Sequence, residues 1–292
     1  HCVPIREVTV SERGKTIRRR RLSRGLRTWR ARAGLTADQA AAALLCGAGT
    51  ISRMENGQSG DPYRVKGLFE LYGAPPEVVA DMIQIAKESR RRPSTVRKPY
   101  HDFVPKRLAE YYELEDEAES LSLLEGECVP GLLETPDYAR ALIAAGEPPA
   151  DIDRLLEIRL TRQLRVTGQD PLRLRVILGE AALHTQVGGP DVLRAQLEYL
   201  LDLVRNAPNV DIRVLPFTAG SRPALGRNFT VMSFPEDEDP DVIFAESVSY
   251  FVLEDETDEV AKFVDAYNRL WQTALDERSS AMLIAKAASE IT

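Results

Sequence analysis

The stretch from Leu22 to Gly57 restricts the possible folds most, because several helix signals follow one another there within a few residues. Its first part carries apolar side chains at spacings of 4, 3 and 4, which place them on one side of a helix: Leu22, Leu26, Trp29 and Ala33. Gly34 follows at the position where glycine commonly ends a helix. A first amphipathic helix is therefore predicted, with its apolar side turned toward a core.

Two more short helices are predicted directly after the first. Thr36 and Gln39 have the spacing of a capping box, in which the threonine hydroxyl accepts a hydrogen bond from a free backbone N–H and the glutamine side chain bonds back. This cap opens a second helix over 37–44. After a short turn, residues 50–55 lie in a third helix that stops at Asn56-Gly57.

The charge of the chain is divided unevenly between its two parts. Residues 1–100 contain 20 Lys and Arg against 9 Asp and Glu, whereas residues 101–292 contain 18 against 36. The first part thus carries +11 and the second −18, which together give the net charge of −7. Such an asymmetry indicates a head that binds a polyanion, attached to an acidic body.

The string LTADQAAAALLCGAGTISRMENG, over residues 35–57, resembles the helix-turn-helix of Xre/Cro/cI-type repressors in length and pattern. The small and apolar docking positions of that motif are filled here by Ala41, Ile51 and Met54. Residues 61–73 and 76–90 are similar to the family's fourth and fifth helices. The resemblance implies a DNA-binding head whose recognition helix, about 47–56, enters the major groove.

The resemblance also implies which residues face base edges: Gly47, Ala48, Gly49, Thr50 and Arg53. Three of these five have no polar side chain. Thr50 is expected to touch a thymine methyl group or to donate a hydrogen bond to a base or phosphate. Arg53 is expected to reach O6 and N7 of guanine, a contact that discriminates by about 1–3 kcal/mol when it is bidentate.

A second group of residues is expected to contact phosphates, which sets the position of the head on the duplex without reading its sequence. These candidates are Arg18, Arg19, Arg20, Arg21, Arg24, Arg27, Arg30, Thr36, Arg64 and Lys66. The first four end a polar, basic stretch over 1–21 that we interpret as a flexible arm. This arm is either a phosphate or minor-groove contact with strong salt dependence, or a merely solvated tail.

The turn of the motif departs from the family at Leu45, where glycine is usual. The backbone at this position enters the left-handed region, which costs a side chain such as leucine roughly 1–2 kcal/mol. We therefore expect a strained backbone at Leu45, unless Gly47 and Gly49 let the turn follow a different path.

Residues 91–104 contain two prolines, several basic residues and little periodicity, and are interpreted as a linker between a head over 22–90 and a body over 105–292. Strands are expected over Leu121–Cys128, Leu172–Leu178, Val210–Phe217, Phe229–Phe234, Val242–Ala245 and Ser249–Leu253. Helices are expected over Pro136–Ala145, Ile152–Val166, Pro190–Arg205, Thr257–Ala274 and Asp276–Ser289. The predicted fold is thus an α-helical Xre-type helix-turn-helix N-terminal domain followed by an α+β C-terminal domain.

The body resembles the domain of unknown function that follows the Xre-type head in a large group of actinobacterial regulators. The strings that carry this resemblance are VPGLLETPDYARALI, VGGPDVLRAQLEYLL, NVDIRVLPFTAG and GRNFTVMSFP. Members of that group are described as antitoxin-like and are typically paired with a small acidic protein encoded next door. Two hypotheses follow. The first is a transcriptional regulator whose body binds an effector or partner and forms a homodimer on a near-palindromic DNA site. The second is an antitoxin-like module that mainly binds a small partner protein, with DNA binding secondary.

Other classes of function have little support. Cys2, Cys46 and Cys128 are far apart, and no His or Cys stands at a metal-ligand spacing from another, so we expect no disulfide framework, no zinc site and no cofactor. The body contains no recognisable nucleophile motif, so an enzyme is not expected. No apolar run reaches the ~20 residues of a membrane helix, and the N-terminus has no signal-peptide pattern. These observations favour a cytoplasmic protein that binds double-stranded DNA and no membrane.

Overall fold

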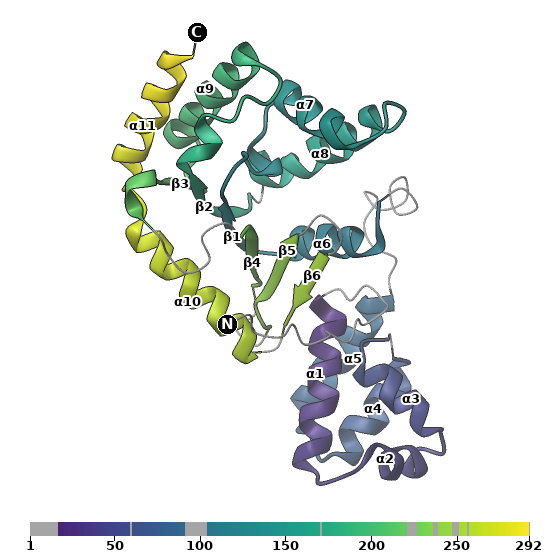
Figure 1. Cartoon of the computed structure of the whole chain (residues 1–292). Helices are drawn as coiled ribbons and strands as arrows, with labels where there is room; N and C mark the ends of the chain where they lie inside the picture. Colours follow the sequence, from purple (N-terminus) through teal and green to yellow (C-terminus); the bar gives the residue numbers. More distant parts are fainter. Residues whose placement is uncertain are drawn as a thin grey trace, which may run out of the picture. The chain divides into compact units, whose positions relative to one another are not determined.

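The computed structural model describes residues 17–58, 60–90, 104–169, 171–220, 227–235, 239–246, 251–255 and 257–291. The chain forms two compact units that divide between Glu113 and Leu114 (Figure 1). Helices α1 to α5 of the first unit form the head, and the second unit is the body. The division falls within α6 (Lys106–Glu117), so the body begins later than the predicted residue 105.

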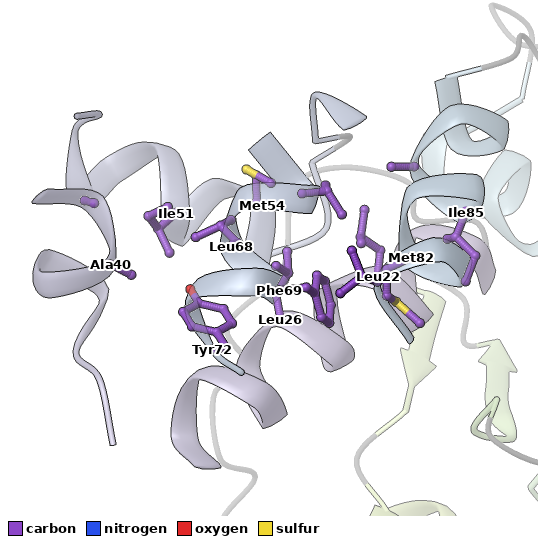
Figure 2. Packing of buried hydrophobic residues seen from close by; sticks show 14 residues of the cluster. Leu22, Leu26, Ala40, Ile51, Met54, Leu68, Phe69, Tyr72, Met82 and Ile85 are labelled. Atoms are coloured by element: carbon purple, nitrogen blue, oxygen red, sulfur yellow. The ribbon is translucent and has the colours of Figure 1, made fainter. Parts of the chain in front are cut away.

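The head contains the predicted helices in the predicted order. They are α1 (Ile17–Arg32), α2 (Ala37–Ala43), α3 (Ala48–Glu55), α4 (Pro62–Leu71) and α5 (Pro76–Arg90). Figure 2 shows how their apolar side chains meet in one core, with Leu22 and Leu26 of α1 close to Phe69 of α4. Burial of each such side chain stabilises the fold by about 1.5–3 kcal/mol. The apolar stripe predicted for α1 is shorter than expected, because Ala33 lies beyond its end and is exposed.

The prediction of a flexible arm that extends to residue 21 is wrong for its last residues. Helix α1 begins at Ile17, whose side chain is buried, and Arg20 is only 7% exposed. The apolar face of the helix therefore starts one turn before Leu22, and its packing orders the basic residues between them. Residues 1–16 of the predicted arm and residues 91–103 of the predicted linker lie outside the described residues.

The predicted capping box and the predicted strain of the turn are both present. The backbone N–H of Gln39 donates to the Thr36 hydroxyl at 3.2 Å, and the backbone N–H of Thr36 donates to the Gln39 side chain at 2.8 Å. Leu45 has a φ of 51°, in the left-handed region, and its side chain is 95% exposed. Leu45 is therefore strained without the compensation of burial.

The body is built on a mixed six-stranded sheet. Its strands are β1 (Ser120–Glu125), β2 (Arg173–Gly179), β3 (Val210–Leu215), β4 (Phe229–Ser233), β5 (Val242–Glu246) and β6 (Phe251–Glu254). The order across the sheet is β3-β2-β1-β4-β5-β6; the first three are parallel, and β4 to β6 pair antiparallel. A strand is present in each of the six expected ranges, and the α+β class is confirmed; residues 249 and 250 of the last expected range lie outside the described residues.

Helices of the body follow the predicted ranges closely. They are α7 (Pro136–Gly146), α8 (Ile152–Thr167), α9 (Pro190–Asn206), α10 (Thr257–Thr273) and α11 (Glu277–Glu290), with short 3-10 turns over Gly131–Leu133, Glu180–Leu183 and Phe217–Ala219. Helix α10 is labelled in Figure 1. Its Tyr267, Leu270 and Trp271 belong to a buried apolar cluster with side chains of the strands. Helix α6 was not predicted, because it lies next to the segment interpreted as a linker. Within the described residues, none of the helices is both long and apolar enough to span a bilayer.

Candidate DNA interface

Helix α3 is oriented by its two apolar side chains. Ile51 is completely buried in the head core and Met54 is 4% exposed. With these two turned inward, the opposite side of the helix faces solvent and carries residues at the spacing i, i+3, i+4 and i+7: Gly49, Ser52, Arg53 and Asn56. We call this side the outward face of α3. It matches the surface that a recognition helix turns toward base edges.

Two side-chain hydrogen bonds order the outward face of α3. Arg53 donates from Nη2 to the Thr50 hydroxyl at 3.4 Å, so the guanidinium lies beside the neighbouring turn. Asn56 donates from Nδ2 to the Ser52 hydroxyl at 3.3 Å. Ser52 and Asn56 were not among the predicted site residues. Their helical spacing from Gly49 was the signal that could have found them.

The N-cap and the first two residues of α3 present few side-chain atoms. Gly47 caps the helix without a side-chain hydrogen bond, and Ala48 contributes only a methyl group. A Cβ atom built on Gly47 or on Gly49 would meet no heavy atom within 4 Å. Neither glycine has a positive φ, so neither is required by packing or by backbone conformation.

The last turn of α3 is held firmly to α1. Arg30 donates to both carboxylate oxygens of Glu55, at 2.6 and 2.8 Å, and also to the backbone oxygen of Leu35 at 2.9 Å. The backbone oxygen of Glu55 accepts from Arg27 at 2.8 Å and from the Ser23 hydroxyl. Because the Glu55 side chain is only 9% exposed, removal of its partner would leave a buried charge, which typically costs about 3–5 kcal/mol.

The ion pair fixes the charge states of the groups around it. The hydrogen bond from Arg30 to Glu55 raises the pKa of the arginine, which keeps it protonated. Burial raises the pKa of the nearby Tyr72 to about 12, and the negative charge of Glu55 adds to this shift. Arg30 therefore stays charged, and Tyr72 neutral, throughout the physiological range.

Several predicted phosphate contacts have other partners in this structure. Arg20 pairs with Glu110 at 3.2 Å and Arg21 with Asp81 at 2.8 Å. Arg27 and Arg30 bind the end of α3 as described above. Tertiary folding brings a carboxylate or carbonyl oxygen to each of these guanidinium groups, so that Arg21, Arg27 and Arg30 join elements of the head and Arg20 joins α1 to α6. Their phosphate contacts stay a prediction.

The other predicted contacts differ in exposure and in partners. Arg18 is exposed, whereas Arg19 and Arg24 are half-buried. The Thr36 hydroxyl caps the first turn of α2. Arg64 is exposed in the first turn of α4, which is capped by Asp61, and Lys66 lies 3.7 Å from Glu70 on the surface of that helix. Thr36 and Arg64 thus lie on the surface at the starts of α2 and α4, and their phosphate contacts stay a prediction.

The body contains acidic groups at the carboxyl ends of its strands. Burial raises the pKa of Glu125, at the end of β1, to about 8, and the charges of Glu246 and Glu134 add to the shift. Glu134 itself accepts two hydrogen bonds from Arg159, at 2.7 and 2.8 Å. Among the residues described, no group of three or more His, Cys, Asp or Glu side chains could hold a metal ion.

Two family models match the chain. One is described as a helix-turn-helix domain and matches residues 21–82, which include α2, α3 and α4. The other is described as a domain of unknown function, DUF5753, and matches residues 108–286. No curated protein and no solved structure matches the chain.

Proposed function

We infer a function from one premise: the chain belongs to the DUF5753 family and carries a helix-turn-helix domain ahead of the family's domain. A DNA-binding regulator is the general function that such a domain supports. We propose, more specifically, a transcriptional regulator of the Xre type whose helix α3 enters the major groove of double-stranded DNA. A role on the chromosome would place the protein in the cytoplasm.

The observation that carries this proposal is the orientation of α3. The helix buries Ile51 and Met54, is tied to α1 through Glu55, and turns Arg53 and its neighbours to solvent. A rigid helix with one outward polar face is what insertion between the phosphate ridges of a duplex requires. Thr36 and Arg64 lie at the starts of α2 and α4 and supply candidate phosphate contacts on either side of α3 in the sequence.

The proposed unit of binding is a homodimer on a near-palindromic site. A single head of this size buries little DNA surface and therefore binds weakly, whereas two heads one helical turn apart add their affinities. The body is proposed to supply the dimer contacts and to bind an effector or partner. By linkage, an effector that changes DNA affinity has its own affinity changed by the same factor.

Binding can be tested with the full chain and a labelled pool of random duplexes of about 30 base pairs, a length that spans two half-sites. We expect a complex at low ionic strength whose affinity falls steeply as salt is added, because arginine–phosphate contacts release counterions. Fluorescence anisotropy measures both effects. Absence of any complex at low salt, for a chain whose melting curve shows it to be folded, would overturn the proposal.

A further inference from the structure

We infer that α3 reads base sequence through one side chain, Arg53, so that each half-site contains one strongly preferred guanine and little preference at the base pairs opposite the first turn of α3. This inference rests on the proposed function and specifies the DNA that the same surface binds. It follows from which chemical groups the outward face of α3 does and does not present.

The reach of the side chains on the outward face singles out Arg53. Gly49 has no side chain and Ser52 has a short one, while Asn56 is the C-cap of α3, at the opposite end from the residues that contact base edges in helix-turn-helix proteins. Arg53 is exposed and has a long side chain with a planar guanidinium. That fork matches O6 and N7 of guanine, and the measured range for such pairs corresponds to about 5- to 150-fold discrimination against another base.

The N-cap and the first two residues of α3 have no side chain that can form a hydrogen bond with a base edge. In helix-turn-helix proteins the first residues of the recognition helix contact base edges, but here they are Ala48 and Gly49, preceded by Gly47 as the cap. None of the three carries a side-chain donor or acceptor. Apart from the Ala48 methyl group, which can make only an apolar contact with a thymine methyl, they present backbone groups that are the same whichever base pair lies opposite.

Thr50 is assigned a positioning role. Its hydroxyl accepts from Nη2 of Arg53, which restricts the rotamers of the long arginine side chain before DNA is bound. Side-chain ordering before binding lowers the entropic cost of a contact. Thr50 therefore acts on the same base pair as Arg53, and not on an independent one.

The first test is a selection from the random duplex pool with the full chain, followed by affinity measurements on the enriched duplex. The wild type is expected to enrich one dominant guanine per half-site. Arg53→Lys keeps the charge but loses the planar fork, so the preference should fall at least fivefold while affinity for the unselected pool stays within about twofold. Thr50→Val should lower the guanine preference partly, with unchanged melting temperature, and Thr50→Ser should restore it.

The matched control is Arg64→Ala on α4, a candidate phosphate contact outside α3. It should weaken binding to enriched and unselected duplexes by the same factor and leave the guanine preference unchanged. The salt dependence of its binding should also be reduced, since one counterion fewer is released.

The second test introduces a side chain that can form hydrogen bonds with a base edge at a position of α3 that has no side chain. Gly49→Gln places an amide on the outward face one helical turn, about 5.4 Å, before Arg53, and no neighbouring atom obstructs it. Glutamine is a better helix former than glycine, so the variant should fold at least as stably as the wild type. It should enrich an additional adenine about one or two base pairs from the guanine, because glutamine pairs with N6 and N7 of adenine.

The outcomes separate this inference from the proposed function. A wild-type selection that yields several strongly preferred base pairs per half-site, and keeps them in Arg53→Lys, would overturn the inference while DNA binding stands. A folded Gly49→Gln chain that binds DNA with an unchanged preferred sequence would also count against it. If the wild type binds no duplex, the proposed function itself fails.

Discussion

The head and the body hold their helices with the same kind of ion pair, but the groups outside those pairs differ between the two. In the head, Arg30 forms an ion pair with Glu55, whose side chain is nearly buried. In the body, Arg159 forms an ion pair with Glu134, whose side chain is 1% exposed, and Arg162 forms one with Glu115, whose side chain is 2% exposed. Outside these pairs, the outward face of α3 presents the exposed cation of Arg53. At the end of β1, burial raises the pKa of Glu125 to about 8, so this carboxyl is largely protonated near pH 7. The comparison teaches that similar internal ion pairs accompany an exposed cation in the head and a buried, neutral carboxyl in the body.

The largest effect is expected from loss of the head pair. Arg30→Ala leaves the Glu55 carboxylate, which is 9% exposed, without its partner and should destabilise the head by about 3–5 kcal/mol, with weaker DNA binding because the end of α3 loses its side-chain tie to α1. Calorimetry of the head transition measures the first effect and anisotropy the second. The double change Arg30→Met with Glu55→Leu is the control, since apolar replacement of a whole buried pair is often tolerated. A single variant with wild-type stability would show that the pair does not hold α3.

An effect of similar or somewhat smaller size is expected in the body. Glu134→Ala leaves Arg159 without this partner. Because the Arg159 side chain is 24% exposed, it regains part of its hydration, and the free energy of unfolding should fall by about 2–4 kcal/mol. Calorimetry should show a lower melting temperature for the body transition. The comparison predicts that DNA affinity measured well below that transition is unchanged. A fall in DNA affinity equal to that of the head variant would contradict the view that the ion pairs of the head and of the body act independently.

A more gradual effect is expected from pH. The folded body raises the pKa of Glu125 from 4.5 to about 8, so the folded state binds a proton that the unfolded state has lost. Stability from this group is complete below pH 4.5 and is lost as pH rises to about 8, after which it levels off. Denaturation of the full chain across this range should show the loss in the body transition. Glu125→Gln should flatten the profile there; an unchanged profile would mean that Glu125 does not cause it.

The smallest effect is expected at the turn of the head. Leu45→Gly removes the strain of a positive φ, worth roughly 1–2 kcal/mol, but adds backbone entropy to the unfolded chain, so the net gain should be about 0.5–1 kcal/mol. Leu45→Val should be less stable than the wild type, because a β-branched side chain tolerates this region worst. Melting temperatures of the head transition check both. A destabilised glycine variant would indicate that the Leu45 side chain makes a stabilising contact despite its exposure.

The helices and strands could be predicted because their sequence patterns involve residues only a few positions apart. The box formed by Thr36 and Gln39, the apolar pair Ile51 and Met54, and the alternation of the body strands each depend on residues a few positions apart. Such interactions form within one element and leave their trace in the local sequence. For the same reason the recognition helix and Arg53 on its outward face could be chosen before any tertiary contact was known.

Partners far apart along the chain were not predictable in this way. The arginines at 20, 21, 27 and 30 looked alike in the sequence as phosphate contacts, yet Arg20 meets Glu110, 90 positions away, and Arg30 meets Glu55, 25 positions away. The same applies to the start of α1, which extends back to Ile17 because that side chain finds a buried place. The residues next to an arginine in the sequence do not predict which distant carboxylate will become its partner in the folded chain.

The amino-acid sequence by itself determined the helices of the motif, the strands of the body, the strained turn and the charge of each part, because propensity, capping and periodicity act over a few residues. Only the tertiary structure decided which arginines are used inside the head, how the strands are ordered in the sheet, and which carboxyl of the body holds its proton to high pH. These depend on burial and on contacts between distant segments, and both exist only once the chain has folded.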